Sequence, residues 1–100
     1  MRESVIERKV CEFAEKQLDC LVRKFVSPGN RGVPDRMFVF PHGTVAFIEF
    51  KAPGKKPTAL QLREIDFLGE RGVSATWHSD ILEATTWLNM VAKKDRRDAR

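Results

Sequence analysis

Two short apolar runs on either side of a tight turn constrain the fold of this chain more than any other feature. Residues 36–40 and 44–51 are mostly apolar, and a Pro-His-Gly turn lies between them. This pattern predicts a β-hairpin. Because side chains alternate between the two faces of a strand, Glu49 and Lys51 project from one face while Phe50 points to the other. A charged pair therefore ends a strand face that is otherwise apolar.

A second carboxylate, Asp35, lies at the start of the first strand of this hairpin. A hairpin brings the start of one strand close to the end of the other, so we expect Asp35 beside Glu49 and Lys51. Two carboxylates suit Mg²⁺, which binds one or two of them and fills its other positions with water and phosphate. Lys51 could then orient an attacking water or stabilise charge on a phosphate. The competing interpretation is a surface salt bridge at a strand end.

Three motifs around these strands carry a family resemblance. They are Gly32-Val33-Pro34-Asp35-Arg36, Glu49-Phe50-Lys51-Ala52-Pro53-Gly54 and Pro57-Thr58-x-x-Gln61. Together they resemble the virus-type replication-repair nuclease (VRR-NUC) domain of the PD-(D/E)XK nuclease superfamily, over most of the chain from about residue 3 to the region of residue 80. The resemblance implies an α/β fold with a restriction-endonuclease-like core, in which helices flank a small mixed β-sheet.

The resemblance also implies an active site and a cofactor, either Mg²⁺ or Mn²⁺. The implied catalytic residues are Asp35, Glu49, Lys51 and Gln61. The implied metal ligands are Asp35, Glu49, the carbonyl of Phe50, and Glu7 from a helix that crosses the end of the sheet. Glu3 lies one helical turn before Glu7 on the same edge of the apolar stripe, and Glu7 is the better match. An ordinary solvated helix face is an equally good interpretation of both.

Periodicity places the other secondary-structure elements. Helical and strand spacings of apolar residues predict elements over residues 3–18, 21–26, 58–72, 73–77 and from 80 onward. The resulting order is α-β-β-β-α-β-α, which is typical of helices packed on a small mixed sheet. Thr58 and Gln61 have the form of a capping box, so Gln61 is either a helix cap or a polar group beside the catalytic lysine.

Basic residues near the motifs are candidates for DNA contact. The loop of residues 27–34 is rich in Gly and Pro, which lets its backbone approach a phosphate chain closely. The nucleic-acid-binding candidates in this loop and in the segment after the second hairpin strand are Arg31, Arg36, Lys55 and Lys56. Surface arginines and lysines on plain connections are the alternative.

The charge distribution predicts a domain over residues 1–92 and a basic, disordered tail over 93–100. The chain carries a formal charge of +4. The tail holds five basic and two acidic residues, so it accounts for most of that charge. Overall basicity is therefore weak support for a nucleic-acid-binding core.

Cys11 and Cys20 lack metal-site spacing, and the chain shows neither a signal peptide nor an apolar run as long as a membrane span. We expect a cytoplasmic protein of a bacterium or phage-infected host, with no membrane partner.

These observations predict a metal-dependent, structure-selective DNA endonuclease that hydrolyses phosphodiester bonds. Stand-alone members of the resembled family are thought to act as homodimers on four-way (Holliday) junctions, and the resemblance implies the same here, with branched DNA as partner. The alternatives are a non-catalytic nucleic-acid-binding module, or a nuclease subunit that acts only within a larger recombination or packaging complex.

Overall fold

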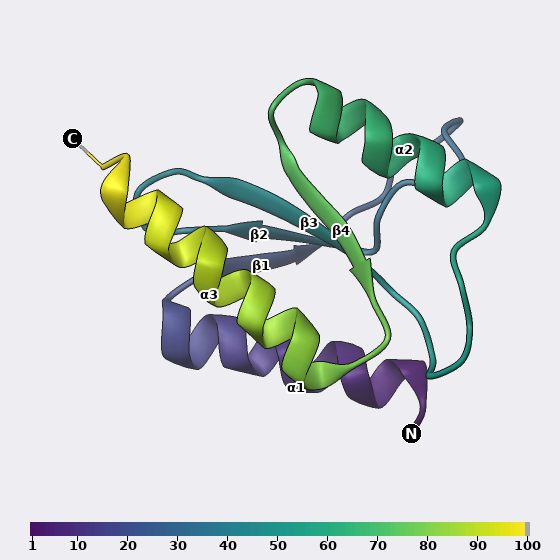
Figure 1. Ribbon diagram of the computed structural model, residues 1–100, viewed down its shortest axis with the longest axis horizontal. Coiled ribbons are helices and arrows are strands. Elements are labelled where there is room, and N and C mark those ends of the chain that lie inside the picture. The colour runs from purple at the N-terminus through teal and green to yellow at the C-terminus, as the bar shows by residue number, and fades with distance from the viewer. Residues whose placement is uncertain (100) are drawn as a thin grey trace.

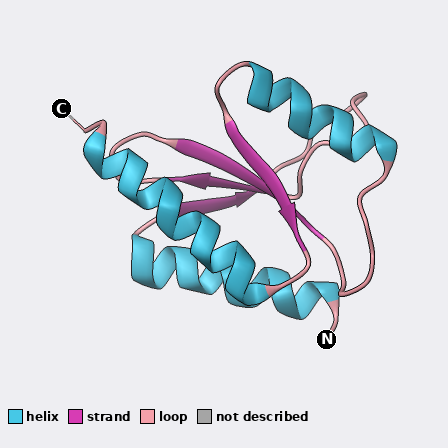
Figure 2. Cartoon of the chain, viewed as in Figure 1, coloured by secondary structure: helices cyan, strands magenta, loops and turns pink. Residues whose placement is uncertain are grey.

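The computed structural model describes residues 1–99. Within them, the helices and strands occur in the order α1 (Glu3–Leu18), β1 (Leu21–Lys24), β2 (Arg36–Val39), β3 (Val45–Phe50), α2 (Ala59–Glu70), β4 (Ser74–His78) and α3 (Ile81–Arg97). This order confirms the predicted α/β arrangement (Figures 1 and 2). None of the helices within residues 1–99 combines the length and apolar character needed to cross a membrane.

The strands form one mixed sheet in the order β1-β2-β3-β4. The predicted hairpin is confirmed: β2 and β3 are antiparallel, with Arg36 opposite Ile48 and Val39 opposite Val45. The chain then crosses through α2 and returns as β4, which pairs with β3 in the parallel direction (Figure 1). Pairing on both sides holds β3 in the interior of the sheet, so the residues at its end are fixed in position.

Helices α1 and α3 pack together against one face of the sheet (Figure 1). Alternate residues of the strands enter this layer, where they meet the apolar stripes of the two helices. The largest fully buried apolar side chains are Phe38, Phe40, Phe50, Ile6, Ile48, Leu88 and Val10. The hydrophobic core therefore lies beneath the hairpin and holds its strands in register.

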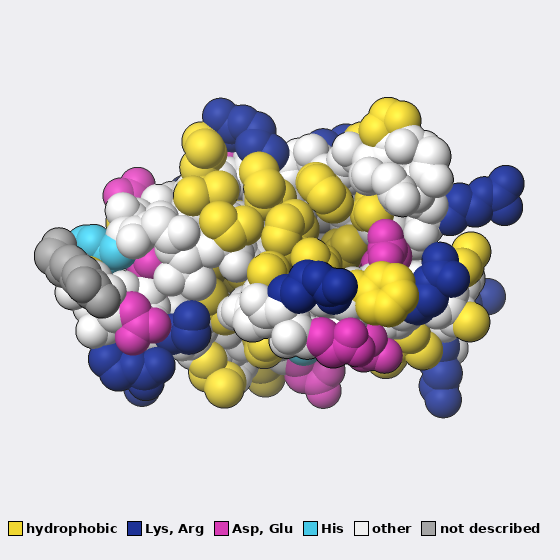
Figure 3. Space-filling view, turned by 90° about the horizontal axis from the view of Figure 1, so that it is seen from above, with side chains coloured by type: hydrophobic (Ala, Val, Ile, Leu, Met, Phe, Trp, Pro, Cys, Tyr) yellow, Lys and Arg dark blue, Asp and Glu magenta, His cyan; other side chains and the backbone are white. Residues whose placement is uncertain are grey.

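The opposite face of the sheet is apolar but only partly covered. Helix α2 lies on this side, against β4 (Figure 1). The side chains of this face on the other strands alternate with the core residues, and they include Leu21, Met37, Val39, Val45 and Phe47. Seen from this side, hydrophobic side chains gather in the middle of the molecule, with Lys and Arg side chains both beside this group and at the margins (Figure 3). We call this surface the open sheet face.

The C-terminal segment differs from the predicted disordered tail, because α3 continues as a helix to Arg97. Asp95 explains the difference. Its carboxylate is buried and accepts hydrogen bonds from the backbone N–H groups of His42 and Thr44, each at 3.0 Å. Burial alone would raise the pKa of Asp95, but these two hydrogen bonds lower it. The last turns of α3 therefore hold the hairpin turn in place through Asp95. Residue 100, the last of the predicted tail, lies outside the described residues.

Candidate active site

Asp35 and Glu49 lie together at one end of the hairpin, as the sequence predicts. The carboxylate of Asp35 accepts a hydrogen bond from the backbone N–H of Phe50 at 2.9 Å, so β3 orients the side chain that precedes β2. Glu49 is buried, with 3% of its surface exposed. The backbone N–H of Lys51 donates to the carbonyl of His78 at 3.0 Å, which anchors the end of β3 to β4. Backbone pairing on both sides thus positions this pair of carboxylates.

The environment of Glu49 raises its pKa to about 7. Burial is the largest cause, because it disfavours the charged carboxylate. The neighbouring carboxyl of Asp35 and the carboxylate of Glu3 raise the pKa further, while the ammonium of Lys51 lowers it. A single ammonium therefore leaves the negative charge of this site incompletely balanced.

Gln61 forms the helix cap that the sequence predicts, and its side chain also reaches Glu49. Its side-chain oxygen accepts from the backbone N–H of Thr58 at 2.9 Å, while the Thr58 hydroxyl accepts from the Gln61 backbone N–H at 3.2 Å. This is the capping box of α2. Its side-chain nitrogen also donates to the carboxylate of Glu49 at 3.0 Å. One amide group therefore starts the helix and orients a carboxylate of the site.

Lys51 projects to the same side as Glu49, as strand alternation predicts. Its Nζ lies 3.7 Å from Oε2 of Glu49, and 16% of its side chain is exposed. This Oε2 also accepts the hydrogen bond from Gln61. The ammonium group is thus close to the carboxylates while still within reach of solvent, where a substrate phosphate would approach.

The donor set of this site fits a divalent cation bound mainly by water and substrate. Oε1 of Glu49 is buried and has no hydrogen-bond partner among the described residues. A buried carboxylate oxygen without a partner is energetically costly, and a cation would satisfy it. Residues 1–99 contain no cluster of three or more His, Cys, Asp or Glu side chains able to hold a metal. Two carboxylates match Mg²⁺, which usually keeps several waters, better than they match a cage made only of protein ligands.

The structure does not bring Glu7, the expected additional ligand, to the carboxylate pair. Glu7 instead forms a part-buried ion pair with Arg36, one of the candidate DNA-binding residues. The hydrogen bond that Arg36 donates to the carboxylate of Glu7 is the largest cause of the raised pKa of Arg36. Glu3, one turn earlier on α1, is the helix carboxylate whose charge acts on Glu49. Spacing along α1 identified both residues, but their contacts with the sheet distinguish them: Glu7 binds Arg36, whereas the charge of Glu3 acts on Glu49.

The other candidate DNA-binding residues remain on the surface. Arg31 is exposed in the loop before β2, and Lys55 and Lys56 are exposed in the connection between β3 and α2. Both segments border the end of the hairpin that carries the carboxylates. Three of the four candidates are therefore exposed on segments adjacent to the site in the chain, whereas the fourth, Arg36, forms an internal ion pair.

Comparisons with known proteins agree with this geometry. No protein-family model matches the chain. One curated relative, "Putative nuclease p44" of Acyrthosiphon pisum secondary endosymbiont phage 1, is 50% identical over 64 residues, which are 64% of this chain and 68% of the relative. A solved structure described as "VRR_NUC domain" superposes with a TM-score of 0.79 at 28% identity, covering 87% of this chain and 94% of its own.

A second solved structure, described as "VRR_NUC domain protein", shares the fold alone. It superposes with a TM-score of 0.75 at 17% identity and covers 93% of this chain and 89% of its own. The fold expected from the motifs is thus found in known structures over nearly the whole chain.

Proposed function

The chain belongs to the VRR-NUC family, and from this premise we propose that it is a metal-dependent, structure-selective endonuclease that hydrolyses phosphodiester bonds in DNA. The observation that carries the proposal is the pairing of the part-buried carboxylate of Asp35 with the buried carboxylate of Glu49, whose Oε1 lacks a partner among the described residues. Mg²⁺ or Mn²⁺ is the proposed cofactor, held by Asp35, Glu49 and the carbonyl of Phe50. Glu3 adds negative charge to the same site.

Each side chain of the site has a proposed role that follows from its contacts. A bound divalent cation would polarise a phosphoryl oxygen and offset the charge that develops on the phosphate. Lys51 orients the attacking water or stabilises the same developing charge. Gln61 holds the carboxylate of Glu49, and the N–H of Phe50 holds that of Asp35. Arg31, Lys55 and Lys56 contact the DNA backbone, which carries no sequence information and suits recognition of DNA shape.

The test of metal binding and cleavage uses variants that change charge with little change in shape. Calorimetry should detect Mg²⁺ or Mn²⁺ binding to the wild type and its loss in Asp35→Asn and Glu49→Gln. Cleavage of single-stranded, flapped, linear and four-way DNA should require the metal and both carboxylates. Unchanged metal binding in both variants would remove this site from the proposal, whereas DNA binding without any cleavage would support a non-catalytic module.

We also propose that the active form is a homodimer that resolves four-way junctions. One chain carries one carboxylate pair and cuts one strand at a time, whereas resolving a junction needs two symmetric cuts. A two-fold dimer supplies them by its geometry. The open sheet face supports the assembly, because it groups one exposed and several partly exposed apolar side chains, and apolar surface of this kind is typical of protein interfaces. The phage relative supports action in the cytoplasm of an infected host.

Light scattering would test the dimer with a matched pair of variants. Leu21 lies on the open sheet face in edge strand β1 and is 49% exposed, while Leu82 on α3 is 72% exposed. We expect Leu21→Lys to yield monomers and Leu82→Lys to leave the dimer intact. A wild-type monomer that cuts linear duplex as readily as junctions would contradict this part of the proposal while leaving the nuclease assignment in place.

A further inference from the structure

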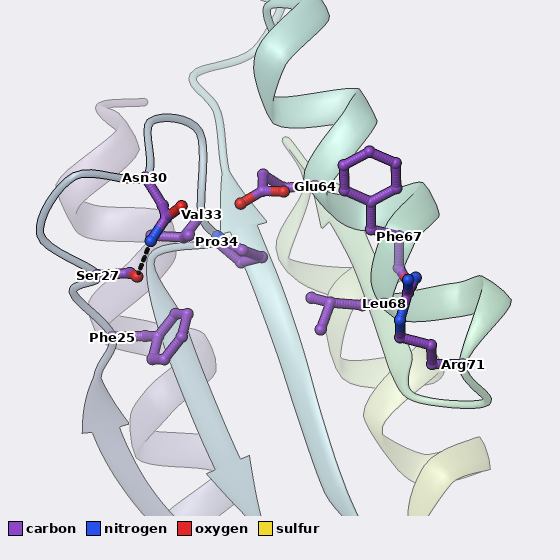
Figure 4. A pocket seen from close by; sticks show the side chains of 9 residues that line it. All are labelled: Phe25, Ser27, Asn30, Val33, Pro34, Glu64, Phe67, Leu68 and Arg71. Atoms are coloured by element: carbon purple, nitrogen blue, oxygen red, sulfur yellow. Dashed lines mark hydrogen bonds between the residues drawn. The ribbon is translucent and has the colours of Figure 1, made fainter.

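A pocket of about 260 Å³ lies between α2 and the loop that precedes β2 (Figure 4). Its walls are mainly apolar, with Phe25, Val33 and Pro34 on the loop side and Phe67 and Leu68 on α2. Polar groups are few. A pocket with apolar walls and a few polar groups is typical of a ligand site, and this one is just below the roughly 300 Å³ at which pockets for drug-sized ligands begin. Its size suits one ring system.

The walls of the pocket belong to the segments that build the active site. Pro34 directly precedes Asp35, and Glu64 lies one helical turn after Gln61. Gly32 packs so closely on the first turn of α2 that an added Cβ would lie 2.7 Å from backbone atoms there. The loop and the helix are therefore held together beside the carboxylate pair, and a strand bound at the site passes near the pocket.

Phe67 gives the pocket an aromatic rim flanked by positive charge. Phe67 is 44% exposed, and the guanidinium carbons of Arg63 and Arg71 lie 5.7 Å and 5.9 Å from the centre of its ring. Arg71 also donates to the backbone carbonyl of Phe67 at 2.8 Å, which fixes it beside the ring. Aromatic rings next to basic groups are the typical means by which proteins hold unpaired bases and their phosphates.

We propose that this pocket binds an unpaired nucleobase of the DNA strand that the active site cleaves, an inference that rests on the proposed nuclease function. A base has apolar faces, which match the ring of Phe67 and the loop wall, and a polar edge with N–H groups. Glu64 turns its carboxylate into the gap between helix and loop, where it can accept from such an edge (Figure 4).

The chemistry of the rim favours a base over the side chain of a protein partner. Two guanidinium groups beside one exposed ring attract a polyanion that carries aromatic rings, and single-stranded DNA has both properties. Fully paired duplex offers no free base. Occupation of the pocket would therefore favour substrates with unpaired nucleotides near the cleavage point, such as flaps and branch points.

The test compares two strands of equal length and charge, an oligothymidylate and an abasic deoxyribose-phosphate chain. Fluorescence anisotropy with Mg²⁺, in a Lys51→Ala background that is expected to slow cleavage, measures the affinity for each. We expect the oligothymidylate to bind more tightly, and Phe67→Ala to reduce this preference by about 5- to 100-fold. Phe67→Trp should retain the preference and Phe67→Leu should lose most of it. Asp66→Ala, at an exposed neighbouring position on α2, is the matched control and should leave it unchanged.

Three results would overturn the inference. The first is equal binding of both strands by the Lys51→Ala background itself, and the second is an equal loss for both strands in Phe67→Ala. The third is dissociation of a dimer by Phe67→Ala with the base preference intact, which would assign the pocket to a second copy of the chain. Cleavage of DNA by the protein with Lys51 intact is measured in parallel. Its absence on every substrate would overturn the nuclease proposal, whereas cleavage without base preference would overturn the pocket alone.

Discussion

Glu49 should make the stability of the metal-free protein fall as the pH rises, opposite to the usual behaviour of a carboxylate. Its pKa is about 7 in the folded chain, mainly because of burial and the neighbouring Asp35, against an ordinary value of 4.5. Below about pH 4.5 the group is protonated in both the folded and the unfolded chain. As the pH rises from there to about 7, the unfolded chain releases the proton while the folded chain retains it, so stability is lost.

The size of this loss follows from the two pKa values. Each tenfold difference in proton affinity is worth 1.36 kcal/mol, so the rise from 4.5 to about 7 corresponds to about 3 kcal/mol above pH 7. In a chain of this length, about 3 kcal/mol lowers the melting temperature by roughly 10–20 °C. Glu49→Gln is neutral at every pH and still offers an oxygen to Gln61. It should match the wild type near pH 4.5 and exceed it near pH 8.

Thermal unfolding of both proteins in EDTA from pH 4.5 to 8 measures the difference. Other groups contribute to each curve: His78, for example, has a pKa lowered mainly by burial, and its contribution falls as the pH drops. Because His78 is present in both proteins, its contribution cancels in the difference. Adding Mg²⁺ at pH 8, at about 100 times its dissociation constant, should restore about 2.7 kcal/mol to the wild type alone. Two parallel curves, with no pH-dependent gap, would refute the reasoning.

Three further predictions address the role of Lys51 in cleavage, the backbone conformation at Gly32, and the hydrogen bonds of Asp95 to the hairpin turn. Lys51→Ala should fold and bind DNA normally but cleave it at least about 100-fold more slowly, because its ammonium acts on transition-state charge; single-turnover rates would show this. Gly32→Ala should lower the free energy of unfolding by about 2–4 kcal/mol in urea titrations, because φ is +86° and its Cβ would strike the backbone of Leu60. Gly29→Ala, with φ of +84° and open space around it, should cost about 1 kcal/mol. Asp95→Ala should cost about 3 kcal/mol in the same assay, because it removes two part-buried hydrogen bonds between a charged carboxylate and the backbone of the hairpin turn.

Local periodicity was enough to predict the sheet and the central part of the site. The hairpin follows from the two apolar runs and the turn between them, and the shared face of Glu49 and Lys51 follows from the two-residue repeat of a strand. The proximity of Asp35 follows because the antiparallel register places the start of β2 beside the end of β3. The start of α2 follows from Thr58 and Gln61, whose contacts span only three residues.

Contacts between residues far apart in the sequence were not predictable in the same way. Asp95 is one charge of the predicted disordered tail, because nothing near it in the sequence shows that a hairpin turn about fifty residues earlier needs its carboxylate. The choice between Glu3 and Glu7 also depends on a distant residue, since Arg36 on β2 binds Glu7. Helical spacing places both carboxylates on the same edge of α1 and leaves the choice open.

The residues of the first turn of α2 both stabilise the start of the helix and orient the carboxylates of the site. The side-chain oxygen of Gln61 is occupied by the helix cap, so its nitrogen is the group left to reach Glu49. The same turn packs directly on Gly32, three residues before Asp35. One carboxylate is therefore oriented by the helix itself, and the loop that carries the other is held against it. A base that bound in the neighbouring pocket and displaced α2 would therefore also move both carboxylates. The structure of the substrate and the geometry of the active site would then both depend on the position of α2.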